Sequence, residues 1–344
     1  MYIVRLRPSG REIRVLEGET VLHAALRQNI NLPHGCKNGI CGLCKAKLST
    51  GIVNPSARLS VGRNDKSEGV LLCCARPETD LLIDEAIGSD LPTRLQCRVA
   101  SMERISDDVM LVELQVQVDE SFDFVPGQYV DFVLDDDTRR SFSIANSPRP
   151  TNTIQIHVRK VAGGKFTSHI FEETKSGDTF KFEGPHGTFH LRPDSTKPIA
   201  FLASGTGFAP IKSIVESMIE RKVQRQAILY WGARRPTDLY LHGLVENWSR
   251  HLQGFKYVPV VSEPTPGDGW RGRVGLVHQA VTQDFPNLSG HEVYACGTPA
   301  MVAAASTTFA SQCQLPLDEF HSDPFTTRHD EVVPVAWPEV IMGR

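Results

Sequence analysis

The spacing of hydrophobic residues over the first 86 positions predicts a small mixed domain of strands and one helix. Apolar and polar residues alternate in Tyr2–Leu6 and Arg11–Val15, which is typical of half-buried strands. Thr20 is a favourable helix N-cap, and the apolar residues that follow it have helical spacing. Two further alternating stretches, at Lys45–Ser49 and Leu81–Asp84, complete the elements predicted for this region.

A run of short strands follows a linker of turn-forming residues at positions 88–93. Pairs such as Pro126-Gly127 and Gly163-Gly164 separate the strands from one another. The predicted strands are Leu95–Val99, Val109–Val118, Tyr129–Leu134, Ser141–Ala145, Ile154–Arg159 and Thr179–Glu183. Many short strands punctuated by glycine and proline indicate an antiparallel barrel.

From Pro198 onward, strands alternate with helices. The strand Ile199–Ala203 leads through a glycine loop into a helix whose apolar face carries Ile211, Ile214 and Met218. The other predicted elements are the strands Ala227–Tyr230, Tyr257–Val261 and Val293–Ala295 and the helices Leu241–Trp248 and Pro299–Ala310. This alternation predicts a parallel sheet, which binds ligands at the carboxyl ends of its strands.

Composition and charge exclude several classes of protein. With 344 residues the chain is long enough for two or three domains, and its net charge of −3 leaves no basic footprint for nucleic acid. The sequence shows no basic and apolar leader, and no apolar run approaches the length of about 20 residues that spans a bilayer. We therefore expect a cytoplasmic protein that binds neither nucleic acid nor membrane.

Five of the eight cysteines fall within the first quarter of the chain. Cys36, Cys41 and Cys44 have the C-x4-C-x2-C spacing of a plant-type [2Fe–2S] site, in a loop rich in glycine. The glycines allow three thiolates to converge from one tight loop, and Cys73 or Cys74 would supply a fourth. Zinc is the chemical alternative, but its sites usually pair two short Cys arms, whereas this chain has a single asymmetric loop.

With its flanking residues, this first quarter resembles the plant-type ferredoxin domain. The resemblance implies a β-grasp fold over residues 1–89 and a cluster held by Cys36, Cys41, Cys44 and one later cysteine. In that family the last ligand is followed by x-A-x-P and an acid, and Cys73 alone fits this frame. Adjacent residues of an extended segment point in opposite directions, so we expect Cys73, and not Cys74, to be the fourth ligand.

The segment from Arg140 to Pro148 resembles the R-x-[YF]-S motif of the ferredoxin–NADP reductase superfamily. Alone, it could be an ordinary barrel strand with one exposed arginine, but further matching segments follow at the family's distance. The resemblance implies an FAD-binding antiparallel β-barrel over residues 93–193, with Ser143 near the reactive ring nitrogen and FAD favoured over FMN. The implied flavin-binding residues are Arg140, Ser141, Phe142, Ser143, His157, Val158, Arg159, Gly164, Lys165, Phe166 and Thr167.

The glycine loop after residue 203 resembles the superfamily's G-x-G-x-x-P nicotinamide loop. A short glycine loop is a weak signal alone, but here it joins a strand to a helix, as the motif requires. The resemblance implies a parallel-sheet, Rossmann-like domain over residues 194–330, with residues 331–344 as an extension. Its implied binding residues are Gly205, Thr206, Gly207, Pro210, Arg234, Arg235, Cys296, Gly297, Met301 and, near flavin, Phe325.

Two of these residues have competing interpretations. Cys296 could be an ordinary buried residue, but the resemblance favours a catalytic position beside the nicotinamide. Arg234 and Arg235 would tolerate the 2′-phosphate of NADPH, whereas nearby Asp238 would oppose it. Since reductases of this architecture mostly use NADH, we expect NADH to be preferred and NADPH to be an alternative donor.

The order of the three domains is similar to that of NAD(P)H reductase components of multicomponent bacterial oxygenases. The loop from Thr206 to Ser213 and the segment from Trp231 to Arg234 most resemble reductases of aromatic-acid ring-hydroxylating dioxygenases, including terephthalate dioxygenase. The resemblance implies electron transfer from NAD(P)H through FAD and the cluster to a Rieske-type terminal oxygenase. The alternatives are a deoxysugar dehydratase or a di-iron monooxygenase as partner, or a redox sensor with negligible turnover.

Overall fold

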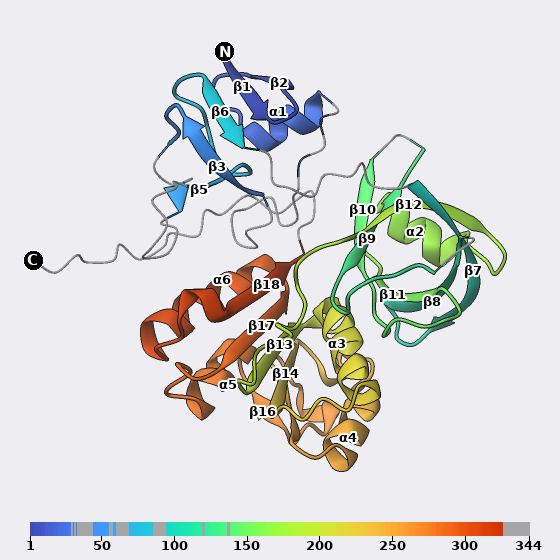
Figure 1. Cartoon of the computed structure of the whole chain (residues 1–344). Coiled ribbons are helices and arrows are strands. Elements are labelled where there is room, and N and C mark those ends of the chain that lie inside the picture. The colour runs from blue at the N-terminus through green and yellow to red at the C-terminus, as the bar shows by residue number, and fades with distance from the viewer. Residues whose placement is uncertain are drawn as a thin grey trace, which may run out of the picture. The chain divides into compact units, whose positions relative to one another are not determined.

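The computed structural model describes residues 1–28, 30, 32, 44–54, 58–59, 69–84, 94–118, 121–135 and 138–325 (Figure 1). The chain divides into two compact units, one built on Met1–Pro92 and the other on Thr93–Phe325. None of the helices in these described ranges is both long and apolar enough to cross a membrane.

The first unit is a six-stranded sheet covered by one helix. Its elements are β1 (Tyr2–Arg7), β2 (Glu12–Val15), α1 (Val21–Arg27), β3 (Lys45–Thr50), β4 (Arg58–Leu59), β5 (Gly69–Leu71) and β6 (Leu81–Asp84). The strand order is β2-β1-β6-β3-β5-β4, with β1 and β6 parallel. The predicted N-cap is confirmed, because Thr20 Oγ1 accepts a hydrogen bond from the His23 backbone N–H at 3.3 Å. The arrangement is the predicted β-grasp fold, and its strands β4 and β5 were not predicted from the sequence.

The second unit begins with an antiparallel barrel. Its elements are β7 (Arg94–Arg104), β8 (Val109–Gln117), β9 (Tyr129–Val133), β10 (Arg139–Ser143), β11 (Thr153–Arg159), α2 (Lys165–Glu172) and β12 (Thr179–His186). The strand order is β10-β9-β12-β7-β8-β11, and a bridge between Ile144 and Ile156 joins the two ends. Helix α2 packs Phe166 and Ile170 into the barrel core.

The second half of this unit is a parallel sheet with helices on both faces. Its elements are β13 (Ile199–Ser204), α3 (Phe208–Glu220), β14 (Ala227–Ala233), α4 (His242–His251), β15 (Phe255–Val261), β16 (Arg273–Val274), α5 (Val277–Asp284), β17 (Glu292–Gly297), α6 (Pro299–Gln312) and β18 (Phe320–Pro324). Helices α3 and α4 lie on one side of the sheet and α5 and α6 on the other (Figure 1). The strand order is β16-β15-β14-β13-β17-β18, so the direction of winding reverses between β13 and β17. Ligands bind at such a switch point, outside the carboxyl ends of the two strands.

The sequence prediction of strand β10 was shifted by two residues. The strand is Arg139–Ser143 and not Ser141–Ala145, because the backbone after Ser143 leaves β9 and pairs with β11. The Ala145 N–H donates to the Gln155 carbonyl at 2.7 Å, which closes the barrel. The prediction also missed β16, α5 and β18, whose sequences are short and carry few alternating apolar residues.

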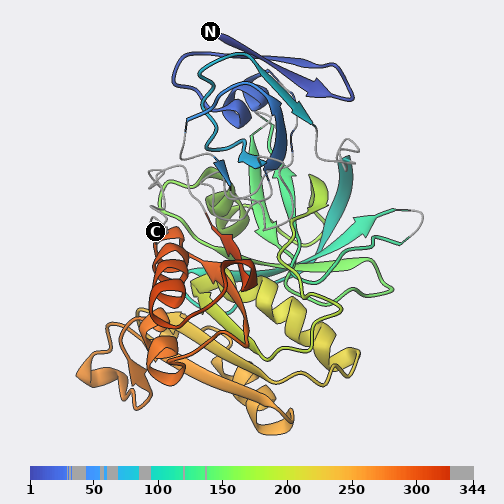
Figure 2. The same ribbon diagram turned by 60° about the vertical axis from the view of Figure 1, so that its left-hand side comes forward.

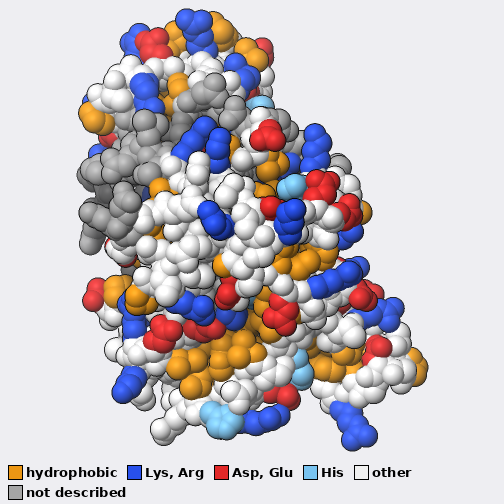
Figure 3. Space-filling view, turned by 90° about the vertical axis from the view of Figure 1, so that its right-hand side faces the viewer, with side chains coloured by type: hydrophobic (Ala, Val, Ile, Leu, Met, Phe, Trp, Pro, Cys, Tyr) orange, Lys and Arg blue, Asp and Glu red, His pale blue; other side chains and the backbone are white. Residues whose placement is uncertain are grey.

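Charges of both signs are interspersed on the face shown in Figure 3. In Figure 2, α3 (yellow) lies beside the barrel strands (green), and hydrogen bonds from Lys212 and Ser213 join this helix to the barrel. The candidate site is built around that junction.

Candidate functional site

Two of the predicted cluster ligands lie together in the first unit. The sulfurs of Cys44 and Cys73 are 3.1 Å apart, and both side chains are buried. Two thiolates bound tetrahedrally to one metal ion at about 2.3 Å have a similar separation, of roughly 3.8 Å. Cys74 Sγ is 3.7 Å from Cys73 Sγ and is partly exposed. Cys36 and Cys41 lie outside the described residues.

The thiol of Cys73 has a raised pKa, first because it hydrogen-bonds to Cys44 and Cys74 and also because it is buried. A bound metal ion reverses this effect, because it stabilises thiolates directly. The donor set therefore fits a thiolate-ligated cluster.

Ser143 of the predicted flavin motif is the last residue of strand β10. Its Oγ is buried and has no hydrogen-bond partner among the described residues. An unpaired buried hydroxyl costs about 1–3 kcal/mol, so such a group usually serves a bound partner. Phe142, the preceding residue of β10, packs against α2, with its ring centroid 5.2 Å from that of Phe166. Ser143 thus fits the group that the motif implies.

The N-terminus of α2 lies next to this strand. Gly164 is its N-cap and supplies no side-chain cap, so the first N–H groups, from Lys165 onward, remain available for an anion. A Cβ at Gly164 would lie 2.6 Å from Thr167 Oγ1, which accepts from the Val161 N–H at 3.2 Å. The hydrogen bond ties the start of α2 to the preceding turn, and the close approach of Thr167 leaves no room for a side chain at residue 164. On β10, Arg140 is half-buried and Ser141 donates to Asp131.

The three predicted residues of β11 face two directions. Val158 is fully buried in the barrel core, so only its backbone could reach a cofactor. His157 and Arg159 point outward, away from that core. Arg159 pairs with Asp108 at 3.2 Å, yet its Nη2 is buried without a hydrogen-bond partner in the described part of the chain. This donor is available for a negatively charged group.

The glycine loop between β13 and α3 lies at the switch point of the parallel sheet. Gly205 has φ +53°, and the Arg159 guanidinium lies against it, 3.1 Å from the position a Cβ would take. A Cβ at Gly207 would lie 2.2 Å from the Cys296 carbonyl oxygen, and one at Gly297 would lie 2.1 Å from Ser204 Oγ. Only glycine permits this close approach of the two loops. Thr206 is half-exposed in this loop, and Pro210 is buried in the first turn of α3.

The aromatic side chains of Trp231 and Phe208 pack against this glycine loop. Trp231 Nε1 donates to the Gly205 carbonyl at 3.0 Å, and the Trp231 ring stacks on Phe208 with centroids 4.1 Å apart. Cys296 is fully buried in the same core. Its pKa lies well above the usual value, chiefly because of burial and then because of the Asp323 carboxylate. The thiol is therefore protonated at neutral pH.

The remaining predicted residues lie around the same edge of the sheet. Arg234 and Arg235 follow β14 and are both exposed, and the Asp238 carboxylate accepts from the Arg235 backbone N–H at 3.1 Å. Met301 lies in the first turn of α6. The Phe325 N–H donates to the Gly297 carbonyl at 2.7 Å, which brings the end of the described chain to the carboxyl end of β17.

Sequence analysis missed two residues that join the halves of this unit. Lys212 on α3 is only 5% exposed, and its Nζ donates to the Ala145 carbonyl at 3.0 Å. Burial lowers its pKa, while the Glu216 carboxylate opposes the shift. The Tyr240 hydroxyl lies 2.8 Å from His157 Nδ1. Burial and the Lys212 charge hold the pKa of His157 well below its usual value.

Three features together define the class of three-part electron-transfer reductases. They are a thiol-rich β-grasp unit, a barrel with buried donors that have no partner in the described residues, and a parallel sheet with a tight glycine loop. The model of the 2Fe-2S iron-sulfur cluster binding domain matches residues 4–78. The models of the oxidoreductase FAD-binding and NAD-binding domains match residues 96–191 and 201–307.

Several relatives match almost the whole chain. It is 39% identical over 330 residues to the CDP-6-deoxy-L-threo-D-glycero-4-hexulose-3-dehydrase reductase of Yersinia pestis, with 94% of this chain and 98% of that protein covered. It is 38% identical over 318 residues to reductase component 1 of terephthalate 1,2-dioxygenase from Comamonas sp., with 90% and 93% covered. The solved structure of an Amycolatopsis cytochrome P450 reductase superposes with a TM-score of 0.69 at 30% identity, covering 95% and 99% of the two chains.

The chain belongs to this family of NAD(P)H-dependent iron–sulfur flavoprotein reductases. It is an electron-transfer oxidoreductase with a [2Fe–2S] domain, an FAD domain and an NAD domain, as the sequence motifs predicted.

Proposed function

We propose that this reductase delivers electrons from NADH to the terminal oxygenase of an aromatic-acid dioxygenase system, with a Rieske-type oxygenase as acceptor. The observation that supports this proposal is that several relatives are oxygenase reductases: that of terephthalate dioxygenase is 38% identical over 90% of the chain, and components of phenol and xylene/toluene oxygenases are 33–35% identical. When bound, the flavin and the cluster supply the conversion of a two-electron donor into single electrons. The chain's own residues bind and orient these groups.

In this proposal Ser143 directs its unpaired hydroxyl at the flavin ring. The N-terminus of α2 and Arg140 hold the flavin phosphates, since free N–H groups and a guanidinium both favour negative charge. Cys36, Cys41, Cys44 and Cys73 hold the cluster. Ser143 is the buried end of β10, and the exclusion of water there strengthens the hydrogen bond that its hydroxyl can donate.

On the nicotinamide side, the absence of side chains at Gly205, Gly207 and Gly297 would let the backbone approach a bound pyrophosphate. Cys296, which lies in the core below this edge of the sheet, would present a neutral thiol toward the nicotinamide, because burial keeps its proton in place. Asp238 places a negative charge beside Arg235, which favours a ribose hydroxyl over a 2′-phosphate. We therefore propose a preference for NADH; a kcat/KM more than tenfold higher with NADPH would contradict it.

A second candidate acceptor is a deoxysugar dehydrase, because the reductase of such a system is 39% identical over 94% of this chain. The two systems use the same reductase chemistry and differ in the protein that receives the electrons. We also propose the domain boundaries 1–89, 93–193, 194–330 and 331–344, and a cytoplasmic location.

Reconstitution distinguishes the acceptors. The purified chain, loaded with FAD and cluster, is mixed with NADH and either a Rieske aromatic-acid oxygenase or a CDP-hexulose dehydrase, and product is measured for each. We expect turnover with the oxygenase that exceeds turnover with the dehydrase at equal protein concentrations. The reverse ranking would assign the chain to deoxysugar synthesis.

A further inference from the structure

One strand of the barrel carries three outward-facing residues that contact the nicotinamide half. In β11 the residues Ile154, Ile156 and Val158 are buried in the barrel core. The alternate residues therefore point away from the core, where strand side chains normally meet solvent. His157 is nevertheless only 4% exposed, because the second half of the unit covers it.

Each alternate residue meets a different element of that half. Gln155 Oε1 accepts from Lys212 Nζ on α3 at 3.1 Å. His157 Nδ1 lies 2.8 Å from the hydroxyl of Tyr240, which precedes α4. The Arg159 guanidinium lies against Gly205 in the nicotinamide loop. We call Gln155, His157, Lys212 and Tyr240 the docking seam.

The Lys212 ammonium group determines which atom donates and which accepts in each hydrogen bond of the docking seam. An ammonium group only donates, so Lys212 requires the oxygen of the Gln155 amide to face it. That same oxygen lies 3.3 Å from His157 Nε2, which must then carry the proton. Nδ1 is left as an acceptor, and the Tyr240 hydroxyl donates to it. Both ring nitrogens of His157 are thus engaged, and its side chain has no free atom for a flavin phosphate.

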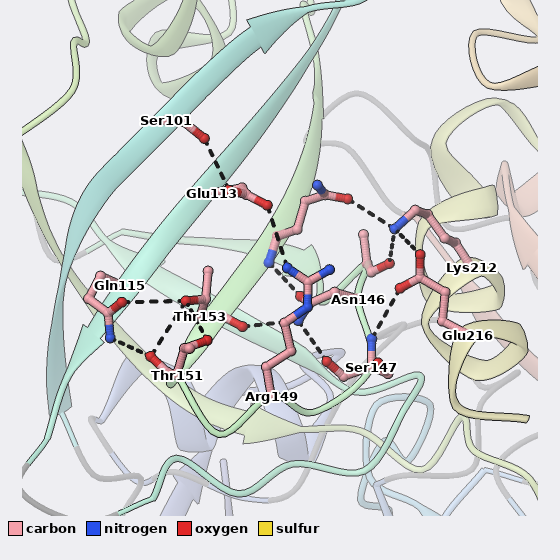
Figure 4. A network of polar contacts seen from close by, with 12 residues as sticks. Ser101, Glu113, Gln115, Asn146, Ser147, Arg149, Thr151, Thr153, Lys212 and Glu216 are labelled. Carbon is pink, nitrogen blue, oxygen red and sulfur yellow. Dashed lines mark hydrogen bonds and ion pairs between the residues drawn. The ribbon is translucent and has the colours of Figure 1, made fainter. Parts of the chain in front are cut away.

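Helix α3 extends the junction along one face. Lys212, Glu216 and Glu220 are spaced by four residues, so they lie in one row on the helix. Glu216 Oε1 is 2.7 Å from Lys212 Nζ, and the Ser147 hydroxyl donates to Glu220 at 2.6 Å. Figure 4 shows Lys212 and Glu216 reaching from the helix toward the barrel loop at Ser147.

This row of residues connects the glycine loop that precedes α3 with the barrel segment that follows Ser143. Helix α3 begins directly after Gly207, and Lys212 holds the carbonyl of Ala145, two residues beyond Ser143. A misplacement of about 1 Å between reacting groups can lower a rate about 10²-fold. A buried lysine is costly unless it is fully paired, so its presence here indicates a positional role.

We propose that Lys212 is a positioning residue which, through the docking seam, fixes the nicotinamide loop against the flavin strand. His157 and Tyr240 act in the same seam. The proposal rests on the family's NAD(P)H-to-flavin reaction and not on the identity of the final acceptor. Its test contains no acceptor protein, so it can fail while the proposed oxygenase partner stands.

The test compares the Lys212→Met protein with the wild type as full-length chains loaded with FAD and cluster. Stopped-flow absorbance gives the limiting rate of flavin reduction and the Kd for NADH, and hydrogen exchange monitors residues 140–147 and 205–213. We expect the limiting rate to fall about tenfold or more, the Kd to change less than about twofold, and exchange to increase in both segments together. Lys212→Arg should restore a large part of the rate.

Lys197→Met is the matched control, because Lys197 forms an ion pair with Glu319 in the same half but away from the barrel. It should leave the limiting rate unchanged. If Lys212→Met fails to fold, Tyr240→Phe removes only the hydroxyl and should lower the limiting rate about threefold or more. Limiting rates within twofold of wild type in the variants that fold, or an equal loss in Lys197→Met, would overturn the proposal.

Discussion

The two units of this chain prepare for their cofactors in different ways. In Met1–Pro92 the expected ligands are reactive side chains, and the sulfurs of Cys44 and Cys73 already lie 3.1 Å apart. In Thr93–Phe325 the preparation consists of backbone approach and unpaired donors, such as Gly207 against Cys296 and the buried Ser143 hydroxyl. The first kind of site depends on which residues are present. The second depends on where distant segments meet, so the two should respond differently to substitution.

The largest expected effect is in the first unit. Cys73→Ser should abolish or strongly destabilise the cluster while FAD remains bound, because a serine hydroxyl is a much poorer iron ligand than a thiolate. Cys74→Ser is the matched control and should keep both groups. Iron content and visible absorbance of the purified proteins measure the outcome. Loss of iron in Cys74→Ser alone would show that the ligand frame is displaced by one residue.

Gly207→Ala tests backbone approach in the second unit. The added Cβ would lie 2.2 Å from the Cys296 carbonyl oxygen, so the nicotinamide loop must move. We expect NADH-dependent flavin reduction to slow about 10²-fold or more, with iron and FAD content unchanged. Gly243→Ala, in α4 of the same half, meets no atom within 4 Å and should reduce flavin normally. Equal rates in the two variants would show that the loop does not hold the nucleotide.

Ser143→Ala tests the unpaired donor. We expect the limiting rate of flavin reduction to fall between about tenfold and 10²-fold, because the hydroxyl no longer donates to the ring. The protein without flavin should be as stable as the wild type or more stable, since the substitution removes a buried polar atom that has no partner in the described structure. Thermal unfolding of the flavin-free protein checks the second part. A clear loss of stability there would mean that Ser143 has a structural role instead.

The smallest expected effect concerns stability in the first unit. The Arg27 guanidinium, which donates to Glu19, lowers the pKa of that carboxyl from 4.5 to about 2. A lowered pKa stabilises the fold above pH 4.5, and this contribution is lost as the pH falls through about 2. Glu19→Gln should lower the free energy of unfolding by only about 1 kcal/mol at pH 7, because Arg27 is half-exposed and solvent screens the pair.

Thermal unfolding monitored through the cluster absorbance measures this loss. The control Glu12→Gln breaks a more exposed pair with Arg5, between β1 and β2 of the same unit, and should lower the free energy of unfolding by less. A Glu19→Gln protein as stable as the wild type at pH 7 would show that the buried carboxylate contributes nothing.

The same contrast explains what could be predicted from the sequence. Most strands of the three sheets were predictable because their periodicity is local. The docking seam was not, because its members are far apart in the chain: Gln155 and Lys212 are separated by 57 residues and His157 and Tyr240 by 83. The outward face of β11 predicts exposure, and only the fold shows what covers it. The contacts of the His157 ring nitrogens with Tyr240 and Gln155 therefore could not be predicted from the sequence.

The most direct test of the whole account is NADH-dependent reduction of cytochrome c and ferricyanide by the wild type and by Cys73→Ser. The account predicts that the wild type reduces both acceptors rapidly. The variant should reduce ferricyanide through flavin but lose most of its cytochrome c activity, since single electrons leave through the cluster. Slow turnover by the fully loaded wild type, or undiminished cytochrome c reduction by the cluster-free variant, would contradict it.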